Sequence, residues 1–151
     1  MTLQELLLIL QSVASAAMCG IIWFVQIVHY PLFAASGDDR AYARENQRRT
    51  RLVVLPFMLV EAVTAAAIAW NPPPGVPRPL AIVGLALVAA LAVSTALLQM
   101  PLHRRFTEEG HLPRLVAALV RSNWLRTLLW TARAALAAWM LHAPAAARHM
   151  E

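Results

Sequence analysis

The feature that most constrains this chain is a long uncharged stretch near its start. No Asp, Glu, Lys or Arg occurs between Glu5 and Asp38, and most of the intervening residues are apolar. About 20 such residues cross the hydrocarbon core of a bilayer as an α-helix. The stretch is longer than the apolar core of a signal peptide, and no basic residue precedes it. It therefore predicts a transmembrane helix that is retained in the protein.

The composition extends this prediction to the rest of the chain. Of its 151 residues, 60% are hydrophobic and only 14% are charged, whereas soluble domains carry roughly 25% charged residues. The 13 basic residues are all Arg, and they flank apolar runs, where basic residues orient helices in a membrane. We therefore expect a lipid bilayer as partner and no nucleic acid. The single cysteine, Cys19, excludes a disulfide framework.

Four apolar segments with polar or proline-rich connections predict an all-α, four-helix transmembrane bundle that forms a single domain over residues 1–151. The connection at residues 71–77 is short, so the helices on either side are antiparallel neighbours. Pro31 and Pro101 lie near helix ends, where proline kinks or terminates a helix. The predicted helices cover residues 3–35, 50–70, 78–103 and 112–141.

The arginines also predict how the bundle is oriented. Nine of them lie in or beside the first and third connections, and only Arg78 and Arg148 lie on the opposite side. Basic residues concentrate in cytoplasmic loops. We therefore expect both termini of this multi-pass protein to lie outside the cytoplasm.

A weak internal repeat appears at an offset of 70 residues. His29-Tyr30-Pro31-Leu32 falls on Gln99-Met100-Pro101-Leu102, and two arginines also coincide. This pattern is compatible with two parallel, pseudo-repeated hairpins, an arrangement known in transporters. Chance is the alternative, because many other matches are Ala or Leu.

Polar residues within the apolar segments are the candidates for a functional site, because polar groups at membrane depth are costly. Gln26 and His29 are three residues apart and are expected on one helix face, and His103 follows Gln99 by four residues. The candidate ligand-binding residues are Gln26, Gln99, Asn123, Arg126 and Arg133, and the candidate catalytic residues are Glu61 and His29.

Glu61 and Arg133 are expected at matching depth. Since an unpaired buried charge costs several kcal/mol, they are natural partners. Their pair could be functional, or it could only fix helix register. His29 could be a hydrogen-bonded core histidine, and His103 could be a solvated interfacial one.

Metal binding is a further hypothesis. His29, His103 and Glu61 are the ligand types of a non-haem iron site, and two histidines could ligate haem in a four-helix bundle. No HExxH motif and no Cys/His cluster supports either cofactor.

Several motifs together resemble a group of small bacterial four-helix integral membrane proteins, which implies a bacterial inner-membrane location. More distantly, the chain is similar to the anthrone-oxygenase-like membrane family, which implies oxidation of a small aromatic, hydrophobic molecule. That family tends to have Asn near the proline of its third helix, where this chain has His103. The motifs are residues 26–32, 56–61, 99–105 and 123–127.

We therefore expect an oxidoreductase or a cofactor-binding protein whose site opens toward the cytoplasm. Arg126 and Arg133 would hold an anionic or carbonyl group, Glu61 would act as base or ligand, and the histidines would bind a cofactor or shuttle protons. The alternative is a dimeric, proton-coupled transporter that uses Glu61. A third reading is a non-catalytic membrane subunit, because runs of Ala permit close helix contacts.

Overall fold

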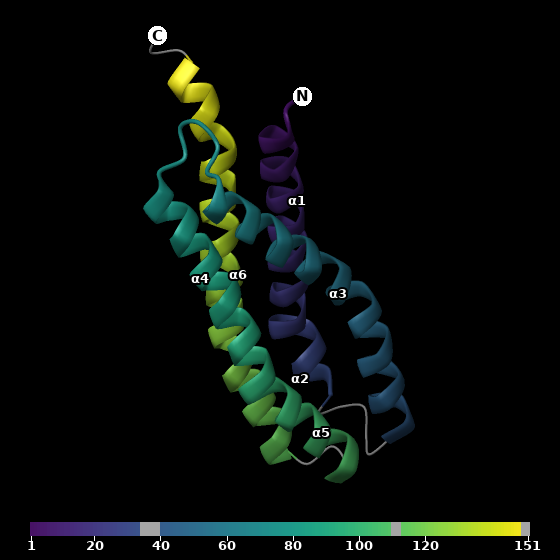
Figure 1. The fold of residues 1–151 in the computed structure, drawn as a ribbon. Coiled ribbons are helices and arrows are strands. Elements are labelled where there is room, and N and C mark those ends of the chain that lie inside the picture. The colour runs from purple at the N-terminus through teal and green to yellow at the C-terminus, as the bar shows by residue number, and fades with distance from the viewer. Residues whose placement is uncertain (34–39, 110–112, 149–151) are drawn as a thin grey trace.

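The computed structural model describes residues 1–33, 40–109 and 113–148, with side chains in the last range through Ala143. Four long helical segments lie side by side, no strand occurs within these ranges, and the start of α1 and the end of α6 lie at the same end of the bundle (Figure 1). The first segment comprises α1 (Leu3–Phe24), the π-helical turn η1 (Val25–His29) and α2 (Tyr30–Leu32), and the second is α3 (Arg40–Trp70). The third segment comprises α4 (Arg78–Ser94), the π-helical turn η2 (Thr95–Gln99) and α5 (Met100–Glu109). The fourth segment is α6 (Pro113–Arg148).

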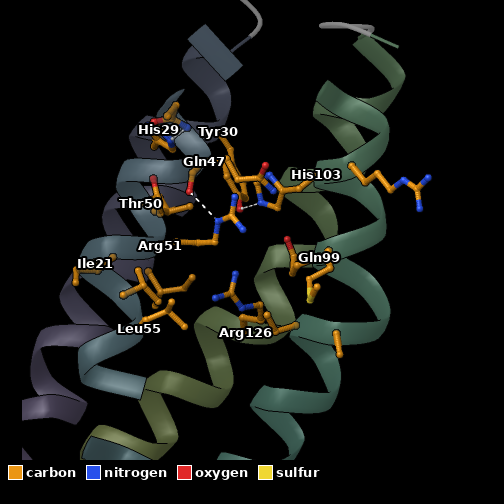
Figure 2. A pocket seen from close by; sticks show the side chains of 18 of the residues that line it. Ile21, His29, Tyr30, Gln47, Thr50, Arg51, Leu55, Gln99, His103 and Arg126 are labelled. Carbon is orange, nitrogen blue, oxygen red and sulfur yellow. Dashed lines mark hydrogen bonds between the residues drawn. The ribbon is translucent and has the colours of Figure 1, made fainter. Parts of the chain in front are cut away.

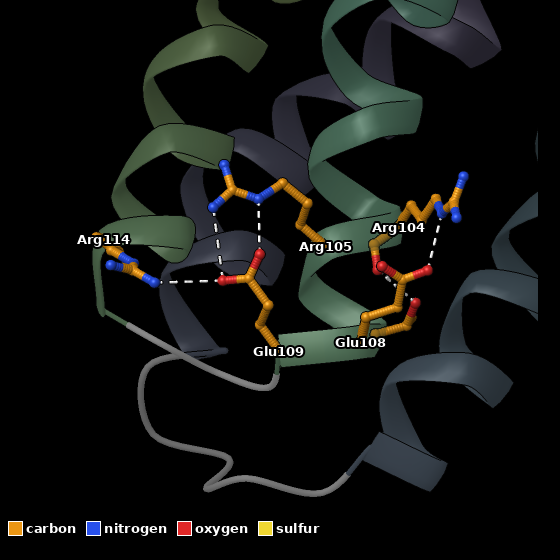
Figure 3. A network of polar contacts seen from close by, with 6 residues as sticks. Arg104, Arg105, Glu108, Glu109 and Arg114 are labelled. Carbon is orange, nitrogen blue, oxygen red and sulfur yellow. Dashed lines mark hydrogen bonds and ion pairs between the residues drawn. The ribbon is translucent and has the colours of Figure 1, made fainter.

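The all-helical prediction is confirmed, but the predicted helix bounds were too short at three ends. The second helix begins at Arg40 rather than near residue 50, the third continues to Glu109, and the fourth continues to Arg148. Charged pairs explain two of these extensions. Glu45 bonds Arg48 and Arg49, and the end of α5 carries similar pairs (Figure 3). Such pairs support a helix that has left the apolar layer.

Three of the four segments in the described ranges are long and apolar enough to span a membrane, namely residues 3–32, 40–70 and 78–109. The fourth segment, α6, is not among them, because Asn123, Arg126 and Arg133 interrupt its apolar sequence. These three polar side chains are buried, whereas large apolar side chains such as Leu59 and Leu97 are exposed. An apolar exterior around a polar interior is compatible with a bilayer as the surrounding solvent.

The interior alternates between apolar layers and polar clusters. At the end of the bundle that carries α2 and α5, here called the α2/α5 end, aromatic side chains of the first and third segments pack together. The middle layer consists of Met18, Ile22, Leu91 and Trp130. A third layer, which includes Leu8, Ile68 and Met140, closes the end near the chain termini.

The two π-helical turns have the same local cause. Each ends two residues before a proline, at His29 before Pro31 and at Gln99 before Pro101. A proline ring clashes with the carbonyl four residues earlier and donates no hydrogen bond. The wider π turn makes room for the ring. The first segment ends soon after Pro31, but α5 continues to Glu109, so Pro101 does not terminate its helix.

η1 and η2 are 70 residues apart, which is the offset of the weak sequence repeat. In each turn a backbone N–H bonds the carbonyl five residues earlier, from Tyr30 to Val25 and from Met100 to Thr95. This shared irregularity is an observation independent of the Ala and Leu matches. An origin of the two hairpins by duplication stays a prediction.

The orientation of the bundle also stays a prediction, and it can be measured with reporter fusions. Because arginines are concentrated at the α2/α5 end, we expect that end to face the cytoplasm. An alkaline phosphatase fused after His149 should then be active, and one fused within the loop at residues 71–77 should be active as well. A β-galactosidase fusion at the same two places should be inactive. The reverse pattern would contradict the predicted orientation.

Candidate functional site

A cavity of about 790 Å³ opens at the α2/α5 end between the first, second and third segments, and Arg126 of α6 reaches it from below (Figure 2). One part of its wall is apolar and the other polar. The apolar wall includes Met18, Ile21, Ile22, Val25, Val54, Leu55, Ala96 and Met100, and the polar wall includes His29, Tyr30, Asn46, Gln47, Thr50, Arg51, Gln99, His103, Arg104 and Arg126. Pockets of this volume and character are typical of sites for one small hydrophobic molecule.

Both candidate histidines line the cavity, and each has a fixed partner. The hydroxyl of Tyr30 lies 2.8 Å from Nε2 of His103. Nδ2 of Asn46 lies 3.1 Å from Nε2 of His29. An amide nitrogen only donates, so Nε2 of His29 accepts this bond. Tyr30 therefore links the first and third segments at the cavity, and Asn46 links the first and second.

Gln26 does not line the cavity but supports Arg126, which does, through Asn123. Its Oε1 accepts bonds from Nδ2 of Asn123 at 3.0 Å and from the hydroxyl of Thr127 at 3.4 Å. Oδ1 of Asn123 in turn accepts a bond from Nη1 of Arg126 at 3.3 Å. Gln26 and Asn123 thus position Arg126, which is 8% exposed and whose Nε has no partner among the described residues.

The prediction that Gln26 and His29 share one face was wrong. Gln26 bonds residues of α6, whereas His29 bonds Asn46 of α3. The cause is η1, because the two residues lie within a π-helical turn, whose wider spiral separates positions that an α-helix would align. The other pair does converge on the cavity, with Gln99 also donating to the hydroxyl of Ser122 at 3.0 Å.

Glu61 and Arg133 form the ion pair expected from their depth. Both side chains are 0% exposed, and Nε of Arg133 lies 2.8 Å from Oε2 of Glu61. The hydroxyl of Ser15 donates to the other carboxylate oxygen. Along their helices, these three residues lie on the far side of the middle layer from the cavity. Neither Glu61 nor Arg133 lines the cavity.

Gly84 of α4 makes room for this pair, a role that the sequence did not predict. A Cβ atom at residue 84 would lie 2.9 Å from Nη1 of Arg133. Nη1 and Nη2 of Arg133 have no hydrogen-bond partner among the described residues. The only sequence signal was a glycine inside an apolar helix, which can mark a close approach.

The three residues predicted as metal ligands are not brought together. His29 and His103 line the cavity, but Glu61 is held by Arg133 and Ser15 beyond the middle layer. Within the described residues, no group of three or more His, Cys, Asp or Glu could hold a metal ion. Haem or metal binding therefore receives no support from this arrangement.

Tyr30, Arg51 and Asn46 are among the polar residues of the cavity that were not predicted as site residues. Tyr30 was noted only as part of the repeat, and Arg51 only as a charge that orients the bundle. Asn46 lies in a segment expected to be a loop. All three belong to the cavity because α3 begins early and because the first segment bends into η1 and α2.

Comparison of the chain with protein-family models, with curated proteins and with solved structures found no match.

Proposed function

We propose that this protein binds a small, hydrophobic, aromatic molecule from the membrane and promotes its oxidation by removing a proton. The observation that carries the proposal is the composition of the cavity wall. Apolar side chains line one part, while Arg126, His29 and the Tyr30–His103 pair line the other. An aromatic ketone with an acidic C–H group fits such a wall, because its ring is apolar and its oxygen is a hydrogen-bond acceptor.

The proton would pass through Tyr30. When the Tyr30 hydroxyl donates to Nε2 of His103 across their 2.8 Å contact, its oxygen can accept a proton from the substrate as its own proton moves to the imidazole. Positioned groups of this kind contribute about 10²–10⁴-fold to a rate. The imidazole of His103 then holds the proton.

The negative charge left on the substrate oxygen would be stabilised by Arg126. This guanidinium is nearly buried, lines the cavity, and is oriented by Asn123. A preorganised donor in a site that excludes water stabilises developing charge more strongly than water does. The resulting enolate is electron-rich and can react with dioxygen as oxidant.

The transport alternative receives less support. That reading needs Glu61 to exchange protons with the cavity, but Glu61 is bonded to Arg133 and Ser15 and does not line the cavity. A non-catalytic subunit would not need a cavity with this polar wall.

Anthrone is a suitable probe, because its central CH₂ group is acidic and flanked by two rings. The reaction with dioxygen yields anthraquinone and water, with one oxygen atom entering the product. We expect the protein in phosphatidylcholine nanodiscs to accelerate dioxygen uptake and quinone formation in equal amounts. An absorption spectrum and elemental analysis of the same sample would detect a bound haem or metal. A rate equal to that of empty nanodiscs would contradict the proposal.

A further inference from the structure

The cavity has more positive charge than its own residues neutralise. Arg51 of α3 and Arg126 of α6 both extend into it (Figure 2). Among the described residues that line the cavity, none is Asp or Glu. Within the part of the chain that the structure describes, Nε of Arg51 donates to the carbonyl of Gln47 at 3.4 Å. Arg104, at the rim, differs because Glu108 lies 2.8 Å from its Nε.

Two guanidinium groups that face one cavity repel each other unless an anion lies between or beside them. Solvent screens this repulsion in part, because Arg51 is exposed, but Arg126 is nearly buried, where the effective dielectric constant is lower than in water. Glu45 on the same helix is not available to Arg51, since it is bonded to Arg48 and Arg49. Negative charge at the cavity is therefore expected to come from a ligand.

We propose that Arg51 is an anion-binding subsite and that the ligand is an aromatic carboxylate. This inference rests on the proposed function, in which Arg126 already serves the reacting oxygen. Arg51 then holds a second, peripheral group. A planar guanidinium matches a singly charged carboxylate through two parallel hydrogen bonds. The neighbouring cavity residues Asn46, Gln47 and Thr50 are uncharged, so the subsite is matched to one negative charge rather than to two.

The rings of such a ligand would lie against the apolar wall formed by Met18, Ile22 and Val54. The carboxylate would stay near the rim, where Arg51 is exposed to solvent. Solvent screens an exposed ion pair and keeps its contribution modest. The subsite should therefore select between ligands rather than supply most of the binding affinity.

The test compares two fluorescent probes of the same shape, anthracene-2-carboxylate and its neutral isostere anthracene-2-carboxamide. Binding is measured by titration of the full chain in phosphatidylcholine nanodiscs, with empty nanodiscs as the partition control. We expect the carboxylate to bind about fivefold more tightly, the upper end of what an exposed ion pair contributes. Arg51→Gln should remove this preference without changing the affinity for the carboxamide.

Arg44→Gln is the matched control, because Arg44 is exposed on the same helix and does not line the cavity. It removes the same charge and should leave the preference intact. Arg51→Lys keeps the charge without the planar fork and should retain part of the preference. Equal binding of both probes, or a preference that survives in Arg51→Gln, would overturn the inference and leave the proposed function standing. If neither probe binds above the nanodisc background, both proposals fall.

Discussion

Replacing Glu61 with Gln is expected to lower the free energy of unfolding by about 3–5 kcal/mol, the usual loss when one partner of a buried ion pair is removed. The substitution leaves the Arg133 guanidinium at 0% exposure without its carboxylate. Nη1 and Nη2 of Arg133 have no partner among the described residues, so no second acceptor is in place to take over. The Ser15 hydroxyl also loses its charged acceptor.

The double variant Glu61→Gln with Arg133→Gln should be more stable than either single variant. It removes both charges, and replacing both partners of a buried pair is far less costly than breaking it. Stability is measured by thermal unfolding in detergent, followed by circular dichroism. The exposed pair Glu45 and Arg49 is the control: Glu45→Gln should cost less than about 1 kcal/mol. Strictly additive losses at Glu61 and Arg133 would contradict the direct contact.

The sequence predicted the helices and this deep pair for one reason, which is that hydrocarbon penalises polar groups strongly. Apolar runs of about 20 residues have few alternatives to a membrane helix. Two opposite charges within such runs must find each other. Glu61 and Arg133 were therefore predictable partners, although 72 residues separate them.

Helix ends and side-chain directions were less predictable. The apolar pattern ends near residue 50, but α3 begins at Arg40, because Glu45 pairs with two arginines one turn away. The direction of Gln26 depends on η1, and the pattern of apolar residues does not reveal a π turn. The proline two residues after the turn was the available signal.

The cavity itself required tertiary information. Arg51 belongs to it only because of the way α3 packs against the first and third segments. The same arginine on a helix rotated by a quarter turn would not line the cavity. Arg51 can both help to orient the bundle in the membrane and line the cavity. The sequence pattern indicates only its role in orientation.

The proposed proton relay predicts the largest effects on activity. Tyr30→Phe keeps the ring and removes only the hydroxyl that contacts His103. It should reduce anthrone oxidation by roughly 10²-fold or more, the scale of a positioned acid or base. His103→Gln should reduce the rate by a similar factor. The loss of one hydrogen bond should lower stability by only about 0.5–1.5 kcal/mol, and the affinity for anthracene-2-carboxamide should be almost unchanged.

The double variant Tyr30→Phe with His103→Gln distinguishes a proton relay from two separate structural contributions. Residues that act as a unit have strongly non-additive effects on rate, so the double variant should be no slower than the slower single variant. His142→Ala is the control, because His142 is exposed on α6 and does not line the cavity; its rate should equal that of the unmodified protein. Multiplicative losses in the double variant would show that Tyr30 and His103 act separately. Variants that melt at a lower temperature yet keep full activity would show that the Tyr30–His103 contact is only structural. A hydrogen bond that only joins the first and third segments affects stability but not proton transfer.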